Sequence, residues 1–285
     1  MSSAKLARLA AEVVTLVLFV AFLFPFFLVL INSAKTAFEV TQFPLVMPSD
    51  WSNIAKNVAT IWTSDNIRYP ASLYSSFIIT VVSLAAISLL SSQAAWALVR
   101  TKSKTSNIIF FVFVAAMVIP FQIVMFPLLS WLRAITDLTG IRLLRSYAGM
   151  ILCYVGFGVS LSLFMYHGFI KSIPVELEEA ATIDGCSRAE IFYRIIFPIL
   201  TPIHATVLVL NGIWIWNDYL LPLLVLGKGN AIQTIPLAVS NFAGAFVKQW
   251  DLILTAILLA MVPVIICFLL AQKYIVKGMV AGSIK

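Results

Sequence analysis

The sequence predicts an all-α polytopic membrane protein, from its composition, the length of its apolar runs and the positions of its basic residues. Of the 285 residues, 61% are hydrophobic and 11% are charged, whereas soluble domains average about 45–50% apolar and about 25% charged residues. The apolar runs are unbroken over about twenty residues, the length that a helix needs to cross a bilayer. A transmembrane barrel would instead need alternating segments of about ten residues. The composition therefore argues against both a soluble fold and a barrel.

The net charge of +7 comes from Lys and Arg residues that are spread over the segments between the apolar runs. No basic cluster with interleaved aromatic residues forms, so we expect these residues to set membrane orientation and expect no nucleic-acid partner. The three cysteines and two histidines have no metal-ligand spacing, and we expect no metal site. The chain also lacks the nucleotide-binding and hydrolase motifs. We therefore expect no catalytic residues and no cofactor, and any energy from ATP must come through another polypeptide.

Six membrane spans are expected within one transmembrane domain of residues 1–285. The expected spans are residues 13–31, 76–99, 108–132, 147–169, 201–225 and 252–274. The first is too long for the core of a signal peptide and no small-residue cleavage site follows it, so we expect it to be retained. The basic turn at Arg100, Lys102 and Lys104 marks the cytoplasmic side under the positive-inside rule. With six spans, both the N-terminus and the C-terminus are then cytoplasmic.

Two spans contain residues that modify an ordinary helix. Pro120 and Pro127 interrupt the hydrogen-bond ladder of the third span, which favours either an ordinary kink or a break that opens a pathway. Gly156 and Gly158 in the fourth span allow another helix to approach closely. The loop after the third span is external by alternation, although it carries more arginines than acids.

A polar segment, residues 173–202, separates the fourth and fifth spans. Ser172 can cap a helix of about eleven residues with acids in its first turn, and Gly185 supplies the left-handed residue expected just past its end. Ser187 to Glu190 form a capping box for a second helix, which we expect Pro198 to close.

The first of these two helices is too short to be stable alone. Leu177, Ala180, Ala181 and Asp184 share one face at helical spacing. The small alanines permit a partner to approach closely, and the acids offer charged contacts. Two interpretations stay open on physical grounds: a hairpin that docks on a partner, and an amphipathic hairpin that lies on the membrane surface.

Three stretches resemble a known family. Glu179-Ala180-Ala181, Asp184-Gly185 and then Phe192, Ile195 and Pro198 resemble, at the same spacing, the EAA loop of permease subunits of binding-protein-dependent ABC importers. Residues 216–222, WNDYLLP, are similar to the late fifth span of sugar permeases. Residues 272–285, QKYIVKGMVAGSIK, resemble the tail of the MalG-like subunit of maltose-type importers. The resemblance covers essentially the whole chain.

The resemblance implies a cytoplasmic coupling helix, within residues 172–198, that sits in a cleft of an ATPase subunit. Its contacts would be Glu179, Ala180, Ala181, Asp184 and Gly185. It also implies that the C-terminal tail contacts the ATPase subunits through Gly278, Ala281 and Gly282. In this family, motion of two such helices switches the permease between inward-open and outward-open states.

The resemblance also implies a set of partners in a bacterial or archaeal cytoplasmic membrane. These are a second, MalF-like permease subunit, two ATP-binding subunits that hold the ATP and Mg²⁺, an extracytoplasmic solute-binding protein, a sugar substrate and membrane lipid. This chain itself would not be an enzyme.

Four residues of the fifth span are candidates for a sugar pathway, because amide groups and aromatic faces suit sugars: Asn211, Trp214, Asn217 and Asp218. An interfacial Trp and an interhelical Asn are the alternative explanation. Two other functions also stay open: an ABC importer for a non-sugar solute, and a secondary transporter. A secondary transporter would need ionisable residues inside its spans, and Asp218 is the clearest of the few present.

Overall fold

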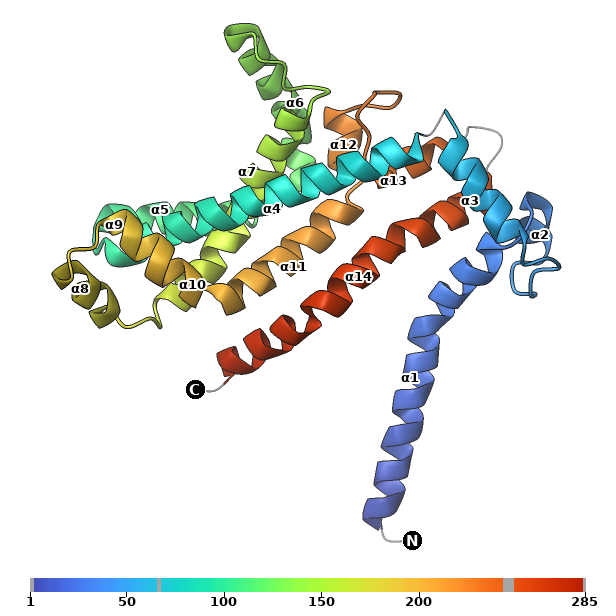
Figure 1. Ribbon diagram of the computed structural model, residues 1–285, viewed down its shortest axis with the longest axis horizontal. Coiled ribbons are helices and arrows are strands. Elements are labelled where there is room, and N and C mark those ends of the chain that lie inside the picture. The colour runs from blue at the N-terminus through green and yellow to red at the C-terminus, as the bar shows by residue number, and fades with distance from the viewer. Residues whose placement is uncertain (1–2, 66–67, 243–248, 284–285) are drawn as a thin grey trace. The chain divides into compact units, whose positions relative to one another are not determined.

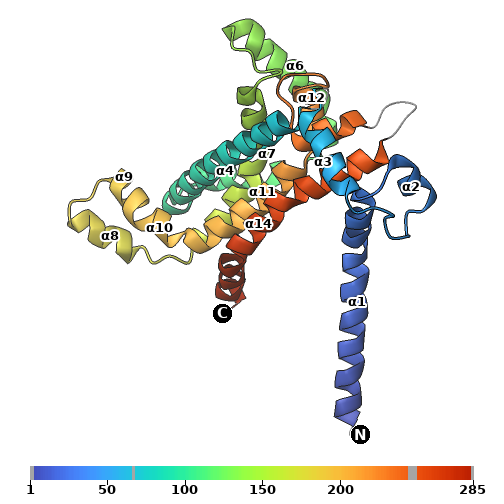
Figure 2. The same ribbon diagram turned by 45° about the vertical axis from the view of Figure 1, so that its right-hand side comes forward.

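The computed structural model describes residues 3–65, 68–242 and 249–283, and every regular element in these ranges is a helix (Figures 1 and 2). The all-α prediction is therefore confirmed. The chain divides into two compact units, Met1–Pro70 with Ala238–Pro263, and Ala71–Leu237 with Val264–Lys285. The expectation of a single transmembrane domain over residues 1–285 stays a prediction.

The first unit is organised around the C-terminal end of α1 (Ser3–Ser33). Lys35 is only 1% exposed, and its Nζ donates to Asn32 Oδ1 and to the carbonyl of Phe43, both at 2.9 Å. Asn57 Nδ2 donates to the Ser33 carbonyl at 3.0 Å. These contacts satisfy polar groups at and just beyond the helix end, which would otherwise lack partners. The other elements of this unit are α2 (Ala37–Gln42), α3 (Asn53–Thr63), the 3₁₀ turn η2 (Ser240–Phe242) and the start of α14 (Trp250–Ser283).

The second unit contains α4 (Tyr69–Arg100) from Ala71 on, together with α7 (Tyr147–Ile170) and α11 (Thr201–Asn217), which lie side by side in both ribbon views (Figures 1 and 2). The close approach occurs at Gly158, where an added Cβ would lie 2.5 Å from Ile87 Cδ1 and 2.9 Å from Asn211 Oδ1. At Gly156 an added Cβ would meet nothing within 4 Å. Of the two glycines singled out in the sequence, only Gly158 therefore serves helix packing.

Four helical segments are long and apolar enough to cross a membrane: Ala7–Ser33, Tyr69–Arg100, Phe121–Thr139 and Tyr147–Ile170. Arg188–Ile199 and Thr201–Asn217 pass this test together but are bent by 74°, which makes up to five. Lys104–Ala116 and Trp250–Ile266 are shorter apolar helices. Within the described residues, the expectation of six spans is therefore supported in part.

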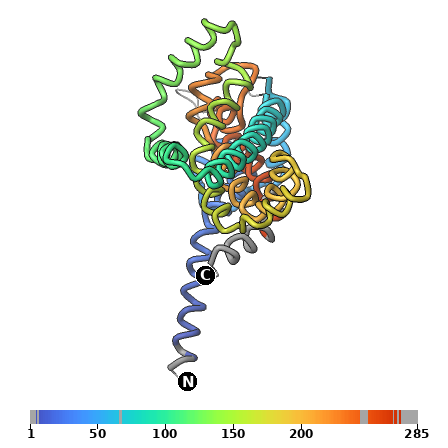
Figure 3. The backbone as a smooth tube through the Cα atoms, turned by 90° about the vertical axis from the view of Figure 1, so that its left-hand side faces the viewer, coloured from blue at the N-terminus to red at the C-terminus, as the bar shows by residue number. Residues whose placement is uncertain are grey.

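The expected third span, residues 108–132, is wrong as a single helix. It breaks into α5 (Lys104–Ala116) and α6 (Phe121–Thr139), and the chain turns between them in Figures 1 and 3. Pro120 is extended, at φ −62° and ψ 136°, and occupies the position just before α6. The helix breaks there because proline lacks an N–H and disfavours a helical residue before it. Pro127 lies inside α6 and does not break it.

The expected fifth span, residues 201–225, also needs correction, because α11 ends at Asn217 and α12 (Leu220–Val225) begins after a break. Asp218 is extended there, at ψ 130°, and its Oδ1 accepts a hydrogen bond from the Leu220 N–H at 3.0 Å. A side-chain carboxylate that caps the next helix in this way competes with continuation of the first.

The polar segment folds as a hairpin of two helices, and only the expected start of the first helix needs correction. Gly185 has φ +84° and ends α8 (Glu176–Ile183) as expected. α8 has eight residues instead of eleven, because Ser172 does not cap it: the Ser172 hydroxyl donates to the Phe169 carbonyl at 2.7 Å. The second helix ends within one residue of Pro198, as expected: it stops at Ile199, and α11 follows after a bend of 74°. The second helix consists of α9 (Arg188–Glu190), the π-helix η1 (Ile191–Ile196) and α10 (Phe197–Ile199).

Candidate functional site

The surface of α8 is the candidate site. Its first turn carries the acids Glu176, Glu178 and Glu179, which are favourable at the positive end of the helix dipole. Because Glu178 and Ala181 are the buried positions, helical spacing directs the opposite face outward. This outward face is acidic and apolar, and it consists of Glu176, Glu179, Ala180 and Ile183.

The face predicted from sequence is therefore divided. Ala181 is buried and belongs to the core of its own unit, so the expectation that it lies on the docking face is wrong. Ala180 and Asp184 are exposed as expected, and Leu177 is 45% exposed. Ile183, 86% exposed, was missed in the sequence analysis, although its position three residues after Ala180 could have indicated it.

Glu178 attaches α8 to the C-terminal end of α4. Arg100 Nε donates to Glu178 Oε1 at 2.8 Å and Trp96 Nε1 donates to Oε2 at 3.0 Å, so both carboxylate oxygens are used. Arg100 Nη2 also donates to the Ile173 carbonyl at 3.1 Å, just before the helix. The Arg100 and Glu178 side chains are only 22% and 11% exposed. A charged hydrogen-bonded pair this well shielded is stronger than a surface ion pair.

The second helix of the hairpin packs on the same part of α4. Phe192 is 2% exposed and lies against Trp96, with ring centroids 5.4 Å apart. The capping box predicted for its start is present, since Ser187 Oγ accepts from the Glu190 N–H at 3.3 Å and Glu190 Oε2 accepts from the Ser187 N–H at 2.9 Å. This bond, the Ser187 hydroxyl and the nearby Arg194 lower the pKa of the Glu190 carboxyl. The cap therefore stabilises the fold at neutral pH, and its contribution is lost as the pH falls through that lowered pKa.

A buried polar network lies where the hairpin joins the apolar helices. Tyr166 OH lies 2.6 Å from His204 Nδ1 and 2.8 Å from Ser88 Oγ. His204 Nε2 lies 3.1 Å from the Phe197 carbonyl of α10. A carbonyl only accepts hydrogen bonds, so Nε2 carries the hydrogen, and in the neutral ring Nδ1 accepts from Tyr166 or from Ser88 Oγ, which is 3.1 Å away. The network joins α4, α7, α10 and α11, and no sequence spacing connects its members.

The four candidate pathway residues lie in three different settings. Trp214 and Asp218 meet at Tyr154: the Trp214 and Tyr154 rings are edge to face at 5.4 Å, and Tyr154 OH donates to Asp218 Oδ2 at 3.1 Å. Asn211 is buried, and its Nδ2 donates to Ser162 Oγ at 3.0 Å, an interhelical bond. Asn217 Nδ2 donates to the Ile213 carbonyl of its own helix at 2.8 Å. The structure therefore does not bring the four together.

The three tail residues, Gly278, Ala281 and Gly282, belong to the last part of α14. Their side-chain surroundings lie outside the described part of the chain.

This arrangement is that of a helical membrane component whose apolar helices are interrupted by a well-anchored polar hairpin with an exposed face. Comparison with known proteins narrows this class. The chain belongs to the family of binding-protein-dependent transport system inner membrane components, whose family model matches residues 87–281.

Curated relatives extend the match over the whole chain. The probable starch degradation products transport system permease protein AmyC of Thermoanaerobacterium thermosulfurigenes is 41% identical over 270 residues, 95% of this chain and 94% of the relative. The melibiose/raffinose/stachyose import permease protein MelC of Bacillus subtilis is 32% identical and covers 99% of this chain and 97% of its own. The multiple sugar-binding transport system permease protein MsmG of Streptococcus mutans is 34% identical, over 74% of this chain and 75% of its own.

A solved structure shares the fold. It is a chain of a bacterial ABC transporter involved in the import of the acidic polysaccharide alginate, with a TM-score of 0.78 at 21% identity. The match covers 96% of this chain and 98% of the other.

Proposed function

We propose that this chain is the permease subunit of an ABC importer for a sugar or an oligosaccharide. The names of three relatives, which concern starch degradation products, multiple sugars and melibiose, raffinose or stachyose, support this substrate class. The observation that carries the proposal is α8, a short helix with an exposed face that is attached to α4 through Glu178.

In this proposal α8 is the coupling helix and its outward face contacts an ATPase subunit. Glu179, Ala180, Asp184 and Gly185 supply the contact, and Ile183 adds an apolar side chain to it. Ala181 supports the helix from behind, because it is buried in this chain's own core. The tail residues Gly278, Ala281 and Gly282 form a second contact with the ATPase subunits.

The contact between Glu178 and α4 would couple ATP hydrolysis to movement of the helices. Closure of the two ATP-binding subunits, which hold ATP and Mg²⁺, displaces α8, and Glu178 transmits the displacement to Arg100 and Trp96 at the end of α4. Because packed helices move as rigid bodies, the bundle switches between inward-open and outward-open states. This chain catalyses no reaction. It pairs with a second, MalF-like permease subunit, and an extracytoplasmic solute-binding protein delivers the sugar.

The proposed orientation places both termini and α8 in the cytoplasm of a bacterium or archaeon. The basic turn after α4 supports it, because cytoplasmic loops carry an excess of Lys and Arg. Of the four pathway candidates, Trp214 and Asp218 are the better supported, because both contact Tyr154, whereas Asn211 and Asn217 each hydrogen-bond elsewhere.

The test uses the reconstituted complex and two variants, Gly185→Pro and Glu179→Lys. Gly185 has a positive φ that proline cannot adopt, and Glu179 lies on the outward face. We expect both variants to insert normally and to lose the stimulation of ATP hydrolysis by sugar-loaded binding protein. Asp137→Lys, the same charge reversal at an exposed position of α6, is the control and should hydrolyse ATP normally.

Normal stimulation in both α8 variants would contradict the coupling role. Uptake of labelled oligosaccharides by wild type tests the substrate class separately. An importer that hydrolyses ATP in response to a non-sugar solute and not to oligosaccharides would contradict that class while leaving the coupling role intact.

A further inference from the structure

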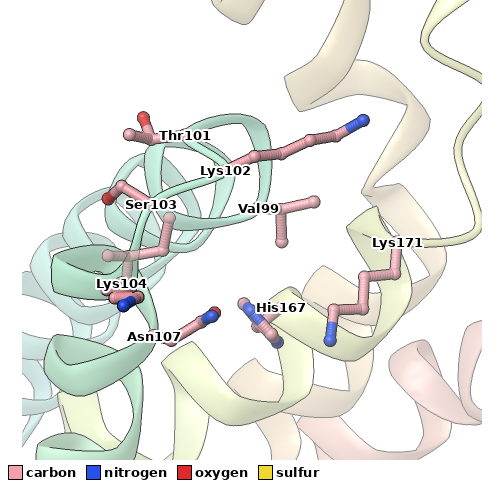
Figure 4. A pocket seen from close by; sticks show the side chains of 9 residues that line it. Val99, Thr101, Lys102, Ser103, Lys104, Asn107, His167 and Lys171 are labelled. Carbon is pink, nitrogen blue, oxygen red and sulfur yellow. The ribbon is translucent and has the colours of Figure 1, made fainter.

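We propose that a basic hollow between the ends of α4, α5 and α7 binds the phosphate of an anionic phospholipid headgroup. The hollow measures about 380 Å³, within the range of small-ligand sites. Its lining consists of Leu98, Val99, Thr101, Lys102, Ser103, Lys104, Asn107, His167 and Lys171 (Figure 4).

The charge of this hollow is uniformly positive. Three of the nine lining residues are lysines and none is acidic. Lys104 and Asn107 stand on the α5 side and Lys171 stands on the α7 side next to His167, whereas Lys102 extends away (Figure 4). α5 begins at Lys104 and has no acid in its first turn, so the positive end of its dipole adds to the field of the two lysines. α4 and α7 reach the hollow with their negative C-terminal ends, so the lysine charges supply most of the attraction. The combination attracts an anion.

His167 supplies a second, independent observation. It is only 7% exposed and its ring stacks on Phe110, with centroids 3.8 Å apart. Among the residues that the structure describes, none makes a side-chain hydrogen bond to this ring. His167 lines the hollow, and its ring nitrogens are not enclosed by the protein. An imidazole N–H in this position can donate a hydrogen bond to a phosphate oxygen.

The surface beside the hollow favours a lipid over free phosphate. Ile108, Phe111 and Val112 continue the Lys104 face of α5 at helical spacing, and they are 63%, 65% and 62% exposed. A phosphate held at Lys104 would therefore have an apolar strip beneath it that an acyl chain can cover. Basic pockets at the ends of membrane helices recognise anionic headgroups in this way. The inference requires only a membrane protein, and it does not depend on the proposed coupling to an ATPase.

The experiment measures binding of phosphatidylglycerol and phosphatidylcholine to the full-length chain in its assembled complex, by native mass spectrometry. The variant is Lys104→Gln with Lys171→Gln. The matched control, Lys56→Gln with Lys228→Gln, removes the same charge from exposed lysines outside the hollow. We expect wild type and control to prefer phosphatidylglycerol, and the hollow variant to bind it more weakly on the order of tenfold. An equal loss in the variant and the control would overturn the site.

Two further experiments test whether the ligand is a lipid or free phosphate, and whether His167 contributes to binding. Inorganic phosphate at millimolar concentration should not displace phosphatidylglycerol; a site that takes inorganic phosphate and shows no preference between the two lipids overturns the lipid assignment. His167→Phe keeps an aromatic ring against Phe110 but removes both nitrogens, so we expect an unchanged melting temperature and weaker phosphatidylglycerol binding. Unchanged binding in this variant would overturn the role of His167.

Discussion

Glu178 holds α8 against α4, whereas the other acids of this short helix remain exposed. α8 has only eight residues, too few to hold its conformation alone, and it presents acids on several sides. Glu178 differs from Glu176 and Glu179 because Arg100 and Trp96 bind both of its oxygens away from bulk solvent. The other two acids stay exposed. One carboxylate therefore anchors the helix while its neighbours remain available to a partner.

Replacing this anchor should destabilise the chain. Glu178→Gln and Arg100→Gln each leave a shielded charged group without its ionic partner, and we expect each to lower the free energy of unfolding by about 2 kcal/mol. In a double-mutant cycle the second change should cost less than the first, because the two residues share one interaction. Denaturant unfolding in mixed micelles measures these values.

Arg8→Gln serves as the control for the anchor, because the Arg8–Glu12 pair has side chains that are 84% and 60% exposed. An ion pair this exposed contributes little to stability, so we expect no measurable change in the free energy of unfolding. Additive effects of Glu178→Gln and Arg100→Gln would show that the pair does not act as a unit.

At the scale of elements, single residues decide where the helices end and where two helices approach each other closely. In α7 the two glycines stand two residues apart, yet Gly158 lies against α4 and α11 and Gly156 faces open space. The turn of the chain between α5 and α6 follows from Pro120, and the end of α11 follows from Asp218. These elements end where a local residue stops them, and they pack where a small residue allows it.

The two glycines provide a matched pair of substitutions. Gly156→Ala should stabilise the chain by up to about 1 kcal/mol, because alanine is the better helix former and its Cβ meets nothing. Gly158→Ala should destabilise it, because the new Cβ would lie 2.5 Å from Ile87 Cδ1, the end of a fully buried side chain. Melting temperatures in the same detergent compare the two, and a gain in both variants would contradict the close packing at Gly158.

At the scale of the whole molecule, membership of a binding-protein-dependent transport family accounts for a chain that is mostly apolar helix and yet keeps a polar hairpin. The apolar helices suit a membrane environment, and the hairpin gives the chain a surface for a partner outside it. In the proposed orientation, α2 lies outside the cell and α8 lies inside. This orientation is open to a direct test.

Labelling of single cysteines tests the orientation. In a variant whose native cysteines are replaced by serine, we introduce Thr41→Cys in α2 or Thr182→Cys in α8, both at exposed positions. A membrane-impermeant maleimide added to intact cells should label position 41 and leave position 182 unlabelled until the membrane is opened. Labelling of position 182 in intact cells would reverse the proposed orientation.

Local sequence was enough for several features. Gly185 ends α8 and Ser187 to Glu190 cap the next helix as expected. Both predictions hold because a left-handed residue and a capping box each involve only residues a few positions apart in the sequence. One local signal gave a wrong prediction. Ser172 does not cap α8, because its hydroxyl donates to the Phe169 carbonyl of the preceding helix.

A helical membrane protein with a capped polar hairpin could be predicted from the residues alone, because hydrophobic length and caps are properties of short segments. The folded chain was needed to show that Glu178 is the anchor and Glu179 the exposed acid, that Ala181 faces inward, and that Gly158 is the close contact. Each of these depends on residues that are distant in sequence, as Arg100 is from Glu178. Which side of a helix is buried is decided by the surface it packs against, and that surface exists only in the folded chain.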